Sequence, residues 1–498
     1  MIYDSYSSVV LLLILLFPFA GALAVLFAGH SIERIRLFAL LAVALNLILS
    51  SSVLFGEGML WSGQSLFWQI GVYDTNPLIP YINASFGLEL DGLSSPLVVL
   101  TNLLGFVAII ASWSMDLRVR EYYFWLLLLL SGVIGVFLST DLLFFFLFWE
   151  IELVPMYLLI SVWGTGNKQY SAMKFVLYTL LGSGFMLMAI LALRFSVGSF
   201  GIHEITIAGQ ENLISAPFLS LYFIYIMLLL GFLVKLPVWP FHTWLPDAHT
   251  DAPTAVSILL AGILLKMGGY GLIRMNLAFF PDISAEFSSF LSALAAFSII
   301  YGAVIVFRQT DIKRVIAYSS VSHMGLVLLG VSSTTIIGVT GAALQMVAHG
   351  TITGLLFLVV GLIYDRTHTR HIPHLGGLIS NAPIIGISFI FGGLASLGLP
   401  FLSGFVAELT VFIGSYSMNP LQTAVGAFGI VLTAGYILWT VERVFYGSPK
   451  EQFSDVKDTY FIDKLAIILL IVPIIGIGVY PKFIFNVIKD SIIPLVGN

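Results

Sequence analysis

The chain has 498 residues, of which 59% are hydrophobic and only 9% are charged, with a net charge of −5. Ordinary soluble domains carry about 25% charged residues, so this composition excludes a soluble enzyme and indicates a polytopic membrane protein. The chain contains no cysteine, which excludes disulfides, thiolate metal sites and a cysteine nucleophile. The small negative charge argues against nucleic acid as a partner.

Apolar runs of about 20 residues, the length that crosses a bilayer core, recur along the chain. We predict about 14 transmembrane helices, by the same length criterion. They begin near Val9, Leu37, Ser94, Tyr123, Leu142, Ala172, Leu221, Thr254, Phe287, Val315, Ile337, Pro383, Leu421 and Leu465. Most of the basic residues fall in alternate loops, which the positive-inside rule assigns to the cytoplasmic side. The two largest loops, 56–91 and 194–220, are long enough for a short hairpin or an interfacial helix.

The expected fold class is an all-α membrane protein with two inverted-topology repeats of five helices each. We divide the chain into helices 1–3 (1–120), a first repeat of helices 4–8 (121–278), a second repeat of helices 9–13 (279–445), and helix 14 with the tail (446–498). Pro237 and Pro240 remove two backbone donors from the seventh span, and Pro400 interrupts the twelfth. Interrupted spans in corresponding positions are typical of transporters built from inverted repeats.

Several ionisable residues lie inside the apolar spans. They are Glu150, Glu152, Lys235, Lys266 and Glu408, together with His323 and His349. A charge at the bilayer centre costs at least about 2.5–3.5 kcal/mol, so such residues are functional candidates by default. The alternative is that they form salt bridges that only hold helices together. Because neutral histidine can pass on a proton near pH 7, we favour a proton relay.

Glu150 and Lys235 are the candidates for a switchable ion pair. A carboxylate about 4 Å from the lysine stabilises its charge by roughly 4 kcal/mol at an effective dielectric constant near 20, and at about 10 Å by roughly 1.7 kcal/mol. Opening the pair would therefore let Lys235 release its proton. Glu152 lies two residues beyond Glu150, about 200° round a regular helix, so both are not expected to face one cavity.

Long motifs resemble the antiporter-like subunits of respiratory complex I, a family that also includes the Mrp sodium/proton antiporters. The resemblance covers roughly residues 90–445 and rests on KLPVWPFHTWLPDAHTDAPTAVSILLAGILLKMGGYGLIRMN, FWEIELVPMY, IKRVIAYSSVSHMG and YDRTHTRHIPHLGGL. Within the family the chain resembles subunit 4, the M or D type. The W-E-x-E-L pattern is similar to the cyanobacterial and plastid branch, whose complex takes electrons from ferredoxin and reduces plastoquinone.

The resemblance implies a role for each matched residue. Glu150 and Lys235 match the paired residues of the fifth and seventh helices, and Lys266 matches the connecting lysine of the eighth. His323 and His349 match the hydrated central axis. Glu408 matches the last residue of the path, a lysine in most relatives, and argues against an Mrp subunit.

The resemblance implies a proton-translocating membrane-arm subunit of an NAD(P)H- or ferredoxin-quinone oxidoreductase (NDH-1) complex. This chain would bind no cofactor or metal, while other subunits would hold the flavin or iron–sulfur centres and the quinone. Expected partners are lipid and other membrane-arm subunits, including further antiporter-like ones, in a bacterial inner membrane or a cyanobacterial thylakoid membrane. The alternatives are an Mrp-type Na+/H+ antiporter subunit, a structural scaffold, and a complex specialised for carbon dioxide uptake. The segment with His368, His371 and His374 is interpreted as a polar loop rather than a metal site, because Pro373 breaks regular structure there.

Overall fold

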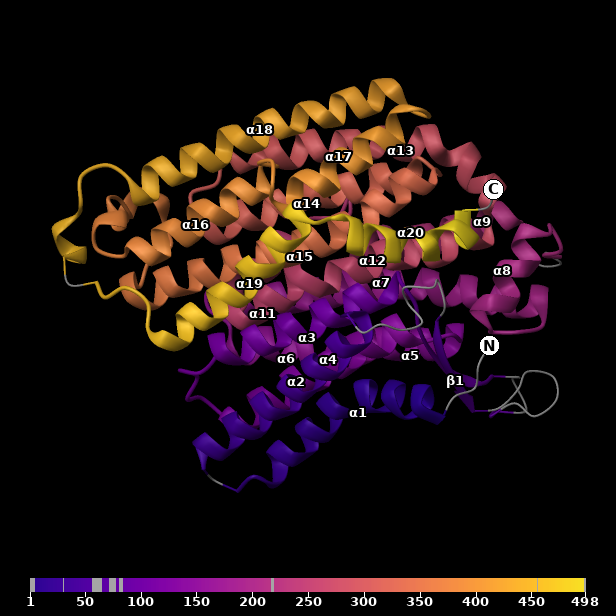
Figure 1. Ribbon diagram of the computed structural model, residues 1–498, viewed down its shortest axis with the longest axis horizontal. Coiled ribbons are helices and arrows are strands. Elements are labelled where there is room, and N and C mark those ends of the chain that lie inside the picture. Colours follow the sequence, from indigo (N-terminus) through magenta and orange to yellow (C-terminus); the bar gives the residue numbers. More distant parts are fainter. Residues whose placement is uncertain are drawn as a thin grey trace.

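The computed structural model describes residues 5–29, 31–55, 65–70, 78–79, 84–215, 219–454 and 456–496 as a bundle of long helices (Figure 1). The first half contains α1 (Ser5–Phe27), α2 (Ile32–Phe55), α3 (Ser94–Ala111), α4 (Val119–Leu138), α5 (Leu142–Ile151), α6 (Leu153–Trp163), α7 (Lys168–Val197), α9 (Leu221–Lys235), α10 (Trp244–Asp251), α11 (Thr254–Leu259) and α12 (Leu265–Gly271). The second half contains α13 (Pro281–Val306), α14 (Ile312–Ser332), α15 (Ile336–Thr367), α16 (Pro383–Ser396), α17 (Ser403–Tyr416), α18 (Pro420–Phe445), α19 (Phe461–Val479) and α20 (Lys482–Val496).

The helical membrane architecture is confirmed. Among the described residues, 12 helical segments are long and apolar enough to cross a membrane. Two shorter apolar helices, α9 and α16, stand where the seventh and twelfth predicted spans begin. The division into two five-helix repeats stays a prediction.

Both large loops contain the small elements that their lengths allow. An antiparallel hairpin, β1 (Leu66–Ile70) with β2 (Phe86–Leu90), pairs Leu66 with Leu90 and is an exception to the all-α expectation. The second loop contains α8 (Ile202–Gln210). The strand β1 and helix α8 lie at the same end of the bundle (Figure 1).

The seventh and twelfth spans are interrupted as their prolines predict. Helix α9 ends at Lys235, and the chain turns through Pro237 and Pro240 before α10 begins. Because α9 ends here, the Val234 carbonyl has no helical partner, and the indole N–H of Trp244 donates to it instead at 3.0 Å. A similar break separates α16 from α17.

Two further spans are irregular. The fifth span is interrupted at Glu152, between α5 and α6, because Pro155 has no N–H to offer the Ile151 carbonyl. The eighth span contains two π-helical turns, η2 (Leu260–Leu264) and η3 (Leu272–Leu277), which flank α12. Such π-turns are frequent at functional sites, and these two lie on either side of Lys266.

The core is formed by the eighth and eleventh spans. The segment Thr254–Leu277 and helix α15 are buried along their whole most apolar stretch, whereas α7, α18 and α19 expose many apolar side chains. Gly268 allows α12 to approach α9 closely, since a Cβ there would lie 2.7 Å from the Leu236 nitrogen and the Phe232 oxygen. The backbone that carries Lys266 is therefore pressed against the end of the helix that carries Lys235.

Candidate functional site

Lys235 lies at the C-terminal end of α9, where the helix breaks, and its side chain is 1% exposed. Its amine forms an ion pair with Glu152, a carboxylate with no exposed surface. The rings of Trp149 and Phe175 lie 5.5 and 5.4 Å from the same amine. Lys235 is thus held between one carboxylate and two aromatic faces, with little access to water.

The direct partner of Lys235 is therefore Glu152, whereas Glu150, the expected partner, acts on the amine over a longer range, so a switchable pair with Glu150 stays a prediction. The two carboxylates point to different sides, as a helical wheel predicts, and it is Glu152 that faces Lys235 while its backbone angles stay helical (φ −70°, ψ −24°). Glu150 is half-buried beside Ser183 of α7, within electrostatic range of Lys235. Two carboxylates consequently act on one lysine.

Lys266 connects the eighth span to the eleventh. Its amine lies 2.7 Å from Nδ1 of His349 and also donates to the Ala261 carbonyl within the π-helical turn η2. Both side chains are buried. The ring nitrogen Nε2 of His349 has no hydrogen-bond partner among the described residues, so it is open to proton exchange.

His323 continues the series toward Glu408. Its ring centroid lies 5.5 Å from that of His349. Its Nδ1 is 3.6 Å from a carboxylate oxygen of Glu408, and its Nε2 is 3.0 Å from the Ser396 hydroxyl. Gln345 lies 3.4 Å from the same Nδ1. Both histidines and Glu408 line a cavity of about 10 Å³, which is about the space that one water molecule needs.

The six candidate residues thus form two groups. Glu150 and Lys235 belong to the first, which Glu152 completes. Lys266, His349, His323 and Glu408 form a continuous series across α12, α15, α14 and α17. Amine, imidazole and carboxylate at hydrogen-bond or one-water separation can exchange protons, and imidazole can accept at one nitrogen and donate from the other.

A further polar site lies at the end of the bundle that holds the hairpin. Asp91 pairs with Arg274 at 2.6 Å beside a cavity of about 500 Å³. Burial opposes ionisation of Asp91, but Arg274 and Ser94 hold its pKa below the ordinary value. Burial and the Asp91 carboxylate raise the pKa of Glu89. Because Asp91 and Arg274 are far apart in sequence, the sequence alone did not predict this pairing.

No metal site is evident in the part of the chain that the structure describes, where no three His, Asp or Glu side chains are placed to hold an ion. The rings of His371 and His374 lie 4.9 Å apart in the loop after α15.

Interrupted helices with buried ionisable side chains define an antiporter-like membrane protein. The family described as "NADH:quinone oxidoreductase/Mrp antiporter, TM" matches residues 139–433, and the chain belongs to this family. The curated "NAD(P)H-quinone oxidoreductase chain 4 2" of Thermosynechococcus vestitus is 42% identical over 462 residues, which cover 90% of this chain and 84% of that protein.

Two solved structures share the fold. A chain of respiratory complex I from Thermus thermophilus, solved with bound NADH, superposes with a TM-score of 0.86 and 28% identity, covering 98% of this chain and all of that one. A chain of the Mrp complex from Dietzia sp. also gives 0.86, covering 99% of this chain and 98% of that one, but is only 19% identical. The likeness to this Mrp chain therefore concerns the fold alone.

Proposed function

We propose that this chain is a proton-translocating membrane subunit of an NAD(P)H-quinone oxidoreductase complex. Its support is the similarity to chain 4 of the cyanobacterial enzymes over most of both sequences, together with the complex I fold. The Mrp alternative has less support, since that likeness is lower in identity. The chain is an integral membrane protein, and its cyanobacterial relatives fit a plasma or thylakoid membrane.

The buried ionisable residues would move the proton. Glu150, Glu152 and Lys235 form the loading group, in which separation of Lys235 from Glu152 lets the amine release its proton. Lys266 then passes a proton to Nδ1 of His349, and His323 delivers it to Glu408. The observation that carries this proposal is the unbroken series from Lys266 to Glu408.

The driving energy would come from other subunits. Moving one charge against 100 mV costs about 2.3 kcal/mol, which the buried residues cannot supply by themselves. We expect flavin or iron–sulfur centres and the quinone in those subunits, and further antiporter-like subunits beside this chain in the membrane. The electron donor, whether NAD(P)H or ferredoxin, is a property of that assembly.

The test is proton uptake by the whole complex in vesicles during quinone reduction. We expect Lys266→Ala and His349→Gln to lower the number of protons taken up per electron while the complex still assembles. Lys482→Met, which removes an exposed lysine from α20, is the matched control. Unchanged uptake in Lys266→Ala would refute the relay. Proton movement driven by a sodium gradient alone, without electron transfer, would favour the antiporter instead.

A further inference from the structure

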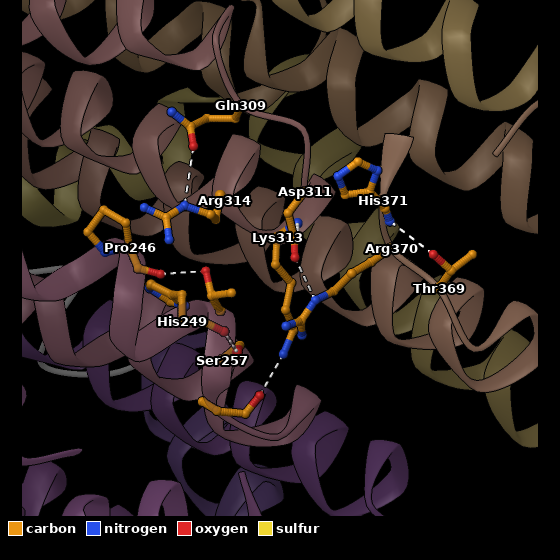
Figure 2. Close-up of polar contacts among 12 residues, drawn as sticks. Pro246, His249, Ser257, Gln309, Asp311, Lys313, Arg314, Thr369, Arg370 and His371 are labelled. Carbon is orange, nitrogen blue, oxygen red and sulfur yellow. Dashed lines mark hydrogen bonds and ion pairs between the residues drawn. The ribbon is translucent and has the colours of Figure 1, made fainter. Parts of the chain in front are cut away.

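A cluster of charged side chains surrounds the start of α14, near the end of α10 (Figure 2). It lies on the side of the bundle that the loops with most of the basic residues occupy, here called the basic face. Asp311 caps α14 and binds Arg370 at 2.7 Å. Arg314 pairs with Asp247 at 3.2 Å. These residues are partly exposed and paired, as a solvated face requires.

Lys313 differs from its neighbours. It is 4% exposed, and among the described residues no carboxylate lies within ion-pair distance of its amine. The amine donates instead to the Ala252 carbonyl at 2.6 Å. Ala252 is the C-cap residue that follows α10, so the lysine lies at the negative end of that short helix. Arg370, Asp311, Asp251 and Asp365 act on this amine only over a longer range. A buried lysine without a carboxylate in direct contact can lose its proton more readily than one in an ion pair.

His249 lies on the inner side of this cluster. It is fully buried on α10, and its ring stacks on Phe357 of α15 with centroids 4.6 Å apart and planes 6° apart. Neither ring nitrogen has a hydrogen-bond partner in the described part of the chain. Buried polar atoms without partners are rare in native proteins and call for an explanation.

The position of His249 supplies that explanation. It lies within electrostatic range of both Lys313 and Lys266, and also of His349. The stacking on Phe357 fixes the ring plane without using either nitrogen. An imidazole with both nitrogens free and two buried amines within electrostatic range can accept a proton at one nitrogen and donate one from the other.

We propose that Lys313 and His249 form an uptake branch that carries protons from the basic face to the pair of Lys266 and His349. This inference rests on the proposed function. The Lys313 ammonium gives a proton to one ring nitrogen of His249, and the imidazolium releases one from the other nitrogen to the neutral amine of Lys266, each transfer passing through water. Lys313 then takes a new proton from the face, and His249 is neutral again.

If Lys313 only stabilises the fold, Lys313→Arg should keep proton uptake, whereas the branch predicts its loss. Arginine would still donate to the Ala252 carbonyl and place a positive charge at the negative end of α10, but it does not deprotonate in proteins. His249→Phe would likewise keep an aromatic ring against Phe357 while removing both nitrogens. Arg314→Lys, which changes the adjacent and partly exposed residue, is the matched control.

The experiment measures protons taken up per electron by the whole complex in vesicles, with Lys266→Ala defining the share that depends on this chain. We expect Lys313→Arg and His249→Phe to lose most of that share and Arg314→Lys to lose none. If Lys266→Ala loses uptake but the other two variants keep it, the branch is wrong and the proposed function stands. If Lys266→Ala keeps full uptake, the proposed function falls and this branch with it.

If His249→Phe fails to assemble, two other variants at this position test the branch. His249→Gln has similar volume and replaces His249→Phe in that case. In addition, His249→Gly leaves room for added imidazole, and recovery of uptake with imidazole but not with its N-methyl derivative would support proton transfer through this position. Recovery with both compounds to the same extent would indicate packing alone and overturn the branch.

Discussion

The ion pair between Lys235 and Glu152 gives the most direct test of the loading group. We predict that Glu152→Gln weakens the complex more than Glu150→Gln does. Glu152 is fully buried and Lys235 is 1% exposed, so neither is screened by water. Removing one partner of such a pair leaves an unpaired buried charge and costs about 3–5 kcal/mol. Glu150 is half-buried and not in direct contact with the amine, so its loss should cost less.

The assay is thermal unfolding of the purified complex, arranged as a double-mutant cycle. Adding Lys235→Met to Glu152→Gln removes both charges, and replacing a buried pair by uncharged groups is often neutral. The double variant should therefore recover most of the lost stability while proton uptake stays low. The reasoning would be refuted if Glu150→Gln destabilises the complex as much as Glu152→Gln does. It would also be refuted if adding Lys235→Met restores the stability of the Glu150→Gln variant but not that of the Glu152→Gln variant.

Three further predictions concern the frame around the site. Gly268→Ala should destabilise the complex by about 1–3 kcal/mol, because its Cβ would lie 2.7 Å from backbone atoms of the α9 end, and Gly184→Ala, with no atom within 4 Å, should not. Trp244→Phe should cost about 1–3 kcal/mol in thermal unfolding by leaving a buried carbonyl unpaired, and an unchanged Tm would contradict this. The pKa of Asp91 is held below its ordinary 3.8 by Arg274, so the pair stabilises the fold above about pH 4 and loses this effect as the pH falls through the lowered pKa. Melting temperatures should accordingly fall less steeply with acid in Asp91→Asn than in the wild type, and identical slopes would count against the pair.

The sequence by itself determined the class of the protein and much of its helical frame. A chain with 9% charged residues cannot form a water-facing surface, and apolar runs of bilayer length set where the spans lie. Pro237 and Pro240 determined the break after Lys235, because proline lacks the amide hydrogen that a helix needs. The cost of charges in lipid also singled out Lys266 and Glu408 as buried functional candidates.

Only the tertiary structure decided which of these groups meet. Glu152 rather than Glu150 contacts Lys235 because of how the fifth span is rotated against α9, and a helical wheel drawn for one helix does not fix that rotation. The contacts of Lys266 with His349 and of Lys313 with Ala252 join residues more than 60 positions apart. Hydrophobic periodicity specifies which face of a helix is buried, but not its rotation or height against a neighbour. Those are set by side-chain packing at close approaches such as Gly268, and so the proton path is a property of the folded bundle.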